Sequence, residues 1–386
     1  MKILKPYYYD KFTCIGNKCP NTCCKGWRIT VDDATYKAYK DVEGTFGKQL
    51  IQNIDCEGKV KKFILDSDMK CPFLNDNLLC DIYINLGEEF MCRTCKVYPR
   101  VIKVHADVIE QTLTLSCPEV SRLLISSNKV IDFKLEEETH SVFKSAKTMD
   151  DALLSCLLHV RSLIIDIMQK RHIKLYYRQL LIIIIADKVQ TSLNKKDYNE
   201  AEVIIQRFYH EDIINLYIEQ FKNIKENKKV KFDFISKLLE QIISCFLDKD
   251  KYISQLYKKY LIDSGMTIES ILGKYEEQFD QYYESHQYVY ENFYVHTIFR
   301  YCLDALDDGD ISKQVVLANI GYIIIHVFDI ISWMDNNKEL SIDNQSLIMG
   351  GFSFAFEHNP IKFNALNEFL EKNNLSSLAF QALMLT

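Results

Sequence analysis

The chain has 386 residues, of which 48% are hydrophobic and 26% charged, and this composition excludes disordered and fibrous proteins. Its net charge of −6, from 47 basic and 53 acidic residues, removes the general electrostatic reason to expect nucleic-acid binding. No apolar secretion signal follows Met1, and the most apolar stretches, 180–186 and 320–334, are too short to span a bilayer. The sequence therefore predicts a soluble, cytoplasmic protein without membrane insertion.

The front of the chain is predicted to consist of loops and one short β-hairpin. Segments 14–26 and 69–82 are rich in turn residues and cysteine, which is typical of loops folded around ligands. β-Branched residues alternate over 101–108 and 110–115, so these segments are predicted to pair around Ala106-Asp107. The acidic run 136–138 is interpreted as the solvated start of a helix.

The rest of the chain is predicted to be helical, because residues 119–359 contain no proline. Apolar spacing predicts a helix over 153–168. Further helices are expected over roughly 174–193, 197–225, 230–247, 251–262, 267–306, 311–334 and 361–383. The predicted fold class is therefore mainly α: a small cysteine-rich metal-binding module with a short β-hairpin (residues 1–135), packed on a large α-helical domain (136–386).

Cysteine is concentrated in the predicted module, where ten of the 13 cysteines lie within the first 117 residues. Eight of them form the candidate ligand set: Cys14, Cys19, Cys23, Cys24, Cys71, Cys80, Cys95 and Cys117. In a chain without a secretion signal, such clustering indicates metal ligation more often than disulfides, although a thiol switch and simple buried thiols remain alternatives.

The spacing of these cysteines does not identify the metal. Zinc and iron–sulfur clusters both accept four thiolates, so the number of sulfurs does not separate them. The pattern is neither a paired CxxC zinc ribbon nor the CxxxCxxC loop of radical enzymes that use S-adenosylmethionine, since Gly26 stands where the third cysteine of that loop would be. Eight cysteines also exceed one four-ligand site, so either some are structural or two centres exist.

Several blocks of the sequence closely resemble the flagellin lysine-N-methylase family, which shares its cysteine module with zinc- or iron-chelating proteins. The blocks in the front segment are 7–27, 71–74, 80–82, 86–89, 94–100 and 116–119. Further blocks are 291–296 with Phe299-Arg300, and 356–359. Cys92 departs from the family pattern, in which a small non-ligand residue is expected, and it is left out of the ligand set.

The resemblance implies methyl transfer to the ε-amino groups of lysines on flagellin, a protein of the bacterial flagellum. It also implies S-adenosylmethionine as the methyl donor and a [4Fe–4S] cluster as the metal centre, with zinc as the alternative. The sequence contains no glycine-rich loop after a strand, so a Rossmann-type methyltransferase site is not expected.

Polar residues near these blocks are the remaining site candidates. Arg93 and Arg100 flank Cys95 and could hold a carboxylate of the donor, neutralise an anionic cluster, or lie on the surface. Asn292 and Arg300 are polar groups in an apolar helix and complete the candidate cofactor-binding set. For catalysis, a lysine must lose a proton before it can attack a methyl group, and Glu291 or His358 could serve as the base.

A second function class stays open. In this alternative, the protein is a non-enzymatic zinc- or iron-binding or redox-sensing protein, and the helical domain is a platform for partners. The resemblance at 291–300 and 356–359 favours the methyltransferase, because a chelating module alone would not need these blocks.

Overall fold

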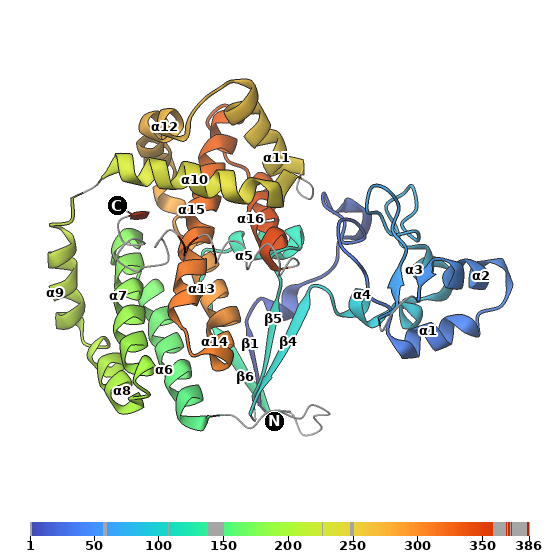
Figure 1. Ribbon diagram of the computed structural model, residues 1–386, viewed down its shortest axis with the longest axis horizontal. Helices are drawn as coiled ribbons and strands as arrows, with labels where there is room; N and C mark the ends of the chain where they lie inside the picture. Colours follow the sequence, from blue (N-terminus) through green and yellow to red (C-terminus); the bar gives the residue numbers. More distant parts are fainter. Residues whose placement is uncertain are drawn as a thin grey trace.

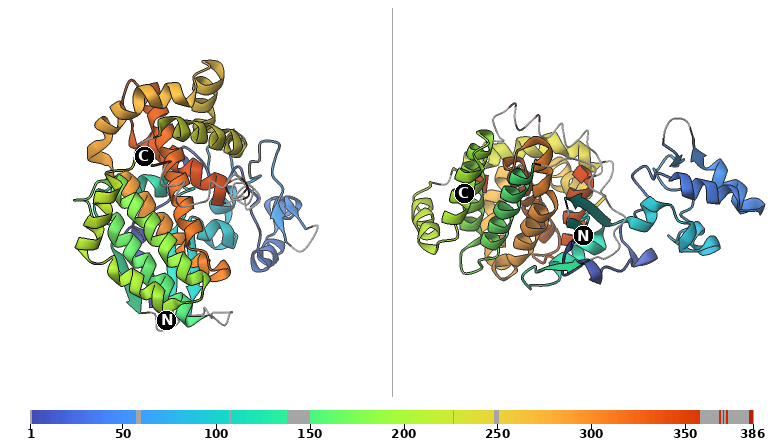
Figure 2. Two further views of the ribbon diagram at one scale, coloured as in Figure 1. Left: turned by 60° about the vertical axis from the view of Figure 1, so that its left-hand side comes forward. Right: turned by 90° about the horizontal axis from the view of Figure 1, so that it is seen from below.

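The computed structural model describes residues 2–56, 60–106, 108–137, 150–225, 227–247 and 251–357, together with residues 368, 370, 372, 384 and 385. About two thirds of the protein is helical, 64% against 9% strand, which confirms the prediction of a mainly α fold. Figure 1 shows a large helical body beside a smaller lobe formed by the front of the chain, and Figure 2 shows the same separation from two other directions.

After residue 150, the helical body contains eleven α-helices in the described residues. They are α6 (Asp151–Met168), α7 (Leu175–Asn194), α8 (Tyr198–Arg207), α9 (Glu211–Phe221), α10 (Lys228–Leu247), α11 (Lys251–Tyr257), α12 (Ile268–Tyr283), α13 (Tyr288–Tyr301), α14 (Ala305–Asp308), α15 (Ser312–Asp335) and α16 (Ile342–Glu357).

The predicted helices form, but two of them are broken. The segment 197–225 divides into α8 and α9 at Phe208–His210, and 267–306 divides into α12 and α13 at a short 3₁₀ turn, Glu284–His286. Neither break contains glycine or proline, so the sequence carries no signal for it. Helix α16 was not predicted, and the predicted helix 361–383 lies almost entirely outside the described residues.

A four-stranded sheet connects the lobe to the body. Its strands are β1 (Lys2–Pro6), β4 (Arg100–His105), β5 (Val108–Leu113) and β6 (Phe133–Glu137), in the order β4-β5-β1-β6. The antiparallel pairing of β4 with β5 confirms the predicted hairpin. The prediction of a helix start at 136–138 is wrong, because Glu136 lies in β6, which pairs with β1, and its carboxylate is 2.9 Å from the Lys5 ammonium.

The lobe has its own small hydrophobic core. It contains α1 (Asp33–Lys40), α2 (Gly44–Gln52), β2 (Ile54–Asp55), β3 (Lys62–Phe63), α3 (Asp81–Leu86) and α4 (Arg93–Val97). Its buried residues include Ile29, Leu50, Phe73 and Cys92. Tyr8, near the N-terminus, is instead buried in the core of the body, and so are the end of β5 and helix α5 (Pro118–Ile125). The hydrophobic cores therefore divide the chain differently from the predicted boundary at 135/136.

Helix α15 forms where the helix 311–334 was predicted, but the prediction that its apolar stretch is too short to span a bilayer is wrong by length and composition. With 24 residues, it is the one described helix long and apolar enough to cross a membrane, yet 89% of its most apolar window is buried inside the protein. This burial is typical of a core helix, so its length is weak support for a membrane span. Cytoplasmic location and the absence of membrane insertion stay predictions.

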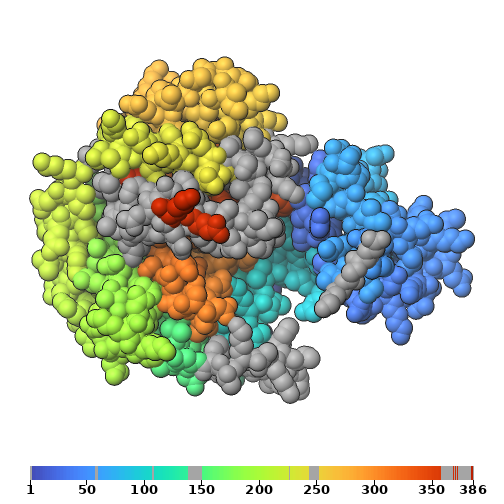
Figure 3. All heavy atoms as spheres, viewed as in Figure 1, coloured from blue at the N-terminus to red at the C-terminus, as the bar shows by residue number. Residues whose placement is uncertain are grey.

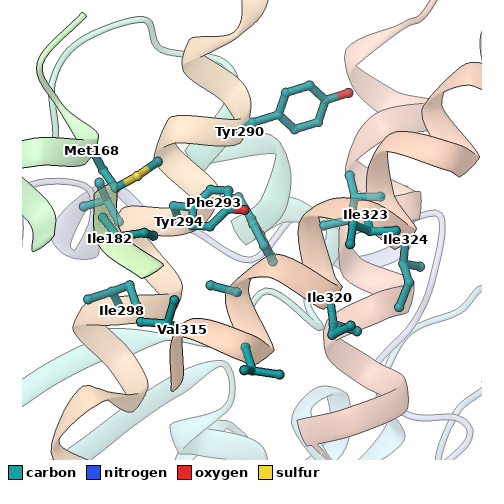
Figure 4. Close-up of a cluster of buried hydrophobic side chains, with 14 of the residues drawn as sticks. Met168, Ile182, Tyr290, Phe293, Tyr294, Ile298, Val315, Ile320, Ile323 and Ile324 are labelled. Carbon is teal, nitrogen blue, oxygen red and sulfur yellow. The ribbon is translucent and has the colours of Figure 1, made fainter. Parts of the chain in front are cut away.

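Helix α13 lies at the centre of the body and is buried on every face from Val289 to Arg300. Figure 4 shows its side chains Phe293, Tyr294 and Ile298 between residues of α6, α7 and α15. The approach of α15 depends on Gly321, since a Cβ at this position would lie 2.4 Å from Phe293 Cζ. A Cβ so close would force the buried ring of Phe293 to move.

A buried ion pair also fixes α13 in place. The Glu291 side chain has no exposed surface, and its Oε1 and Oε2 atoms lie 2.9 Å from Arg171 Nη2 and 2.8 Å from Arg178 Nη1. The two arginines come from the α6–α7 connection and from α7. This pairing supplies the compensation that a buried carboxylate requires.

Replacing Gly321 with alanine should destabilise the protein by about 1–3 kcal/mol, because the added methyl group overpacks the contact with Phe293. Gly273→Ala is a matched control within a helix, since a Cβ there meets nothing closer than 4.0 Å. That control should be neutral or stabilising by up to about 1 kcal/mol. Urea unfolding measures both changes, and equal effects of the two substitutions would contradict the packing argument.

The Glu291→Gln variant should lose about 3–5 kcal/mol of unfolding free energy, because it leaves Arg171 and Arg178 without their counter-charge. Glu219→Gln, which breaks the exposed pair with Lys222, is the control and should have a much smaller effect. A Glu291→Gln protein as stable as the parent, but inactive, would instead support the catalytic role predicted from the sequence.

Candidate active site

The cysteines of the predicted ligand set are free thiols in the structure. They gather in two neighbourhoods that meet at Cys23 and Cys24. The first group is Cys14, Cys19, Cys23 and Cys117. Burial raises the pKa of the Cys117 thiol, and the nearby charges of Cys19 and Cys14 raise it further. The second group is Cys24, Cys71, Cys80 and Cys95, joined by Cys92. The side chains of Cys23 and Cys24 are hydrogen bonded to each other, so the two groups meet at this adjacent pair.

Cys92 is a residue that the sequence analysis left out. It is buried, and its Sγ lies 3.4 Å from Sγ of Cys95. A signal for it was present in the sequence, since Cys92-Arg-Thr-Cys95 is a CxxC pattern, and this pattern opens helix α4.

Three features of the thiol groups fit a metal centre bound by thiolates. Backbone N–H groups point at sulfur: those of Ile82 and Tyr83 donate to Cys80, and those of Glu119 and Val120 donate to Cys117. Such bonds stabilise the charged form of a thiol that burial disfavours. The groups also provide four thiolates each, the number that zinc and iron–sulfur clusters require.

The third feature is an unpaired hydroxyl. Tyr39 is completely buried, and its Oη has no hydrogen-bond partner among the described residues. Burial raises the pKa of Tyr39, and the pKa is raised further by the charges of Cys92, Cys95, Cys80 and Cys71. The Tyr39 hydroxyl therefore lies beside the second group. A negatively charged sulfur centre would supply the missing acceptor. In the described parts of the chain, however, no three His, Cys, Asp or Glu side chains are close enough to share one ion.

A cavity of about 640 Å³ lies where the lobe meets the sheet and the body. We call it the interface cavity. Its lining comes from the lobe (Trp27, Thr30, Arg93, Thr94), from the sheet (Arg100, Thr114) and from the end of α13 (Arg300). Figure 3 shows the lobe and the body meeting on one face of the molecule. The cavity adjoins the thiol groups, because Trp27 Nε1 donates to the Cys23 carbonyl at 2.7 Å and Arg93 and Thr94 lie between Cys92 and Cys95.

The interface cavity combines basic and aromatic side chains with two carboxylates, those of Asp32 and Asp33. Within the described residues, neither the Arg93 nor the Arg100 guanidinium forms an ion pair, whereas Lys61 is paired with Asp33 at 2.6 Å. The rings of Trp27 and Tyr98 lie side by side, with centroids 5.7 Å apart. These groups can bind a ligand that carries a carboxylate and a flat ring system.

Arg300 joins the cavity to a buried polar cluster. Its Nη2 is ion paired with Glu357, while its Nε and Nη1 have no partner in the described part of the chain. Glu357 also accepts a hydrogen bond from Thr114 Oγ1 at 2.6 Å. Three of the four predicted cofactor-binding residues, Arg93, Arg100 and Arg300, therefore line one cavity although they lie far apart in sequence.

The other predicted residues lie elsewhere. The Asn292 amide donates to the carbonyls of Leu124 and Ser127 at 3.0 and 3.1 Å, which anchors α13 to the end of α5. Glu291 is enclosed by its arginines and does not line the interface cavity, so its catalytic role stays a prediction that the geometry does not favour. His358 lies outside the described residues, and its catalytic role also stays a prediction.

His296 is a further residue of the cluster that was not predicted as a site residue. It is 2% exposed, and its Nδ1 lies 2.7 Å from the Tyr8 hydroxyl. Its Nε2 has no partner among the described residues. The sequence contained a signal, because Asn292, His296 and Arg300 recur every four residues in an otherwise apolar helix and so lie on one face of it.

Sequence comparisons relate this chain to lysine N-methylases. The family described as "FliB lysine N-methylase C-terminal domain" matches residues 161–384. The chain is 23% identical to the Lysine-N-methylases of Salmonella typhimurium (strain LT2) and Salmonella choleraesuis (strain SC-B67) over 288 residues, 71% of this chain and 71% of each relative. It is 32% identical over 132 residues to the Flagellar biosynthetic protein FliU of Salmonella muenchen, covering 32% of this chain and 76% of the relative.

No solved structure matches the chain. The family match begins in α6 and spans α13, so it includes Arg300 and the central helix that reaches the interface cavity. It also covers more than half of the sequence. The chain belongs to the FliB lysine N-methylase family.

Proposed function

We propose that this protein transfers methyl groups from S-adenosylmethionine to lysine ε-amino groups of flagellin, with the donor bound in the interface cavity. The observation that carries the proposal is the meeting of Arg93, Arg100 and Arg300 in one cavity of a lysine N-methylase family member. Flagellin as the substrate is supported by the name of the relative FliU, a flagellar biosynthetic protein.

The donor's chemistry fits the lining of the cavity. The methionine carboxylate would bind the unpaired guanidinium groups of Arg93 and Arg100, which form strong charge-assisted hydrogen bonds with carboxylates. The adenine ring would pack against Trp27 and Tyr98. A volume of about 640 Å³ is within the range of small-molecule sites.

The donor supplies an electrophilic methyl group. The methyl carbon forms a bond to the neutral lysine nitrogen as its bond to sulfur breaks, and sulfur keeps that electron pair. The methylated nitrogen then loses a proton to water. The lysine must be neutral to attack, so the protein has to bind the amine where its charged form is disfavoured. The arginines contribute by orienting the donor.

We further propose that the thiol groups hold a metal centre, a [4Fe–4S] cluster or, as the alternative, zinc. Cys24, Cys71, Cys80 and Cys95 around Tyr39 would form one four-thiolate set, and Cys14, Cys19, Cys23 and Cys117 another. Bound metal would contribute to folding, because it joins loops of the lobe whose own hydrophobic core is small.

One observation favours the alternative of a redox-sensing protein. Cys92 and Cys95 form a CxxC pair at the start of a helix with sulfur atoms 3.4 Å apart, an arrangement common in thiol chemistry. This reading does not account for the unpaired arginines of the interface cavity.

Arg100→Gln should weaken binding of S-adenosylhomocysteine, the demethylated donor, by about ten- to a hundredfold, as expected for the loss of a charged hydrogen bond. Arg207→Gln on α8, outside the interface cavity, is the control and should bind like the parent. Isothermal titration calorimetry measures the affinities, and mass spectrometry of co-expressed flagellin measures methylation. A parent protein that leaves flagellin lysines unmodified would overturn the proposed function.

Substitution of Cys71 by serine should remove metal and lower the melting temperature, because serine is a poor ligand for zinc or an iron–sulfur cluster. Cys56→Ser is the control, since Cys56 is an exposed cysteine of the same lobe outside both groups. Elemental analysis and visible absorbance after anaerobic purification identify the metal. A folded parent protein without iron or zinc would contradict the proposal of a metal centre.

A further inference from the structure

Strand β4 lies at one edge of the four-stranded sheet, and one side of its backbone is unpaired. The order β4-β5-β1-β6 gives β4 a neighbour on one side only. At the start of this pairing, the Thr114 N–H donates to the Pro99 carbonyl at 2.8 Å. Backbone bonds alternate along an antiparallel strand, so the odd-numbered residues of β4 bond to β5, whereas Arg100, Ile102 and Val104 direct their N–H and C=O groups outward. Within the described parts of the chain, nothing is hydrogen bonded to these outward groups.

This free edge opens into the interface cavity. The cavity is lined by Arg100 and Val101, whose side chains lie on opposite faces of the sheet because they are neighbours in a strand. A cavity that contacts both faces at the start of β4 extends around the edge between them. None of the described residues of β6, the opposite edge, lines the cavity. Figure 1 shows β4 at the side of the sheet nearer the lobe.

The inner side of β4 is held in a fixed position. Lys103 Nζ donates to the Arg300 carbonyl at 2.8 Å and is ion paired with Asp304. A strand fixed in this way is preorganised to accept another strand, since binding does not have to order it. Ile102, midway along the strand, is 38% exposed, so the described residues leave the edge accessible there.

We propose that an extended segment of flagellin pairs with the free edge of β4 and carries the acceptor lysine into the interface cavity. This inference rests on the proposed function, because it assigns the binding mode of the protein substrate in the same reaction. An extended peptide added to a sheet edge gains main-chain hydrogen bonds, and pockets along the edge select its side chains. Donor and acceptor then share one cavity, as direct transfer of a methyl group requires.

The pairing decides where the acceptor lysine lies. Directly opposed residues of neighbouring strands project their side chains from the same face of a sheet. A residue paired with Arg100 therefore projects on the same face as the Arg100 guanidinium, which lines the cavity. The residues before and after it project from the other face, so the register of the added strand selects one position for the lysine.

The charges of the cavity favour the reactive form of the amine. Positive neighbours such as Arg100 and Arg300 lower the pKa of an amine, and so does its removal from water. The affinity for the substrate comes from its main chain, so the site needs no carboxylate to attract an ammonium group. The two carboxylates of the lining are already engaged, because Asp33 is paired with Lys61 at 2.6 Å and Asp32 caps helix α1.

Ile102→Pro tests the inference, because it removes an outward N–H without removing a bond to β5. Proline is tolerated on an edge strand where its missing N–H faces away from the neighbouring strand. The KM for flagellin should rise at least about fivefold, since the substrate loses a main-chain hydrogen bond and meets the proline ring. The Kd of S-adenosylhomocysteine should stay within about twofold of the parent's value.

Leu135→Pro is the matched control at the other edge of the sheet. The Tyr7 N–H donates to the Asp132 carbonyl at 2.9 Å, so the alternation along β6 directs the Leu135 N–H away from β1. Leu135 is 58% exposed and does not line the interface cavity. This variant loses the same kind of edge donor and should keep the parent's KM and Kd. An equal rise in KM for both proline variants would mean that proline disturbs the sheet, and would overturn the inference.

Hydrogen–deuterium exchange of the parent protein gives a test without substitution. Adding flagellin should slow exchange of the Arg100, Ile102 and Val104 amides at least about fivefold, because pairing occupies their N–H groups. The amides of β6 should exchange at the same rate with and without flagellin. Unaltered exchange in β4 at a flagellin concentration well above its KM would contradict the inference.

The outcomes separate the inference from the proposed function. If the parent methylates flagellin and Ile102→Pro has an unchanged KM, the edge is not the docking site, although the enzyme assignment stands. If Ile102→Pro also loses affinity for S-adenosylhomocysteine, the edge belongs to the donor site and the inference fails. If the β4 amides are protected without flagellin and the protein sediments as a dimer, a second copy occupies the edge and the inference fails. If the parent leaves flagellin unmodified, the proposed function fails first.

Discussion

The structure depends on the requirement that polar groups buried on helix α13 must each find a partner. This helix is enclosed on all sides, yet it carries Glu291, Asn292, His296 and Arg300. A buried carboxylate or guanidinium without a counter-charge would cost several kcal/mol. Each of these groups is therefore bonded to a different part of the chain: the α6–α7 region, the end of α5, the N-terminal segment and α16.

These bonds also decide where the site forms. Tyr8 follows β1, and Thr114 follows β5, so the partners of His296 and Glu357 come from the sheet that connects the lobe to the body. The sheet in turn holds Arg100 at the start of β4, beside the lobe. The polar cluster thus holds Arg300 beside the sheet that carries Arg100, and both arginines line the interface cavity.

Much of the fold and part of the site follow from local sequence patterns. The β4–β5 hairpin and most helices were predicted from residue spacing, because periodicity reports which face of an element is buried. Helix breaks at Phe208–His210 and Glu284–His286 were not predicted, because they contain no glycine or proline and are set by packing. The strand β6 was missed for the same reason: its acidic residues suggest a solvated helix, and only pairing with β1 makes it a strand.

The sequence by itself determined the mainly helical fold class and the family resemblance, and it predicted a chemical site at the cysteines and arginines of the front segment, whose density is visible without coordinates. The tertiary structure decided how they are grouped: Arg100 with Arg300 in one cavity, and Glu291 enclosed by arginines. It also showed that His296 is buried with Nδ1 bonded to Tyr8 and with Nε2 lacking a partner among the described residues. The physical reason is that spacing along the chain fixes only which residues share a local face. Contacts between residues hundreds of positions apart depend on how whole elements pack, and a single sequence does not display that packing.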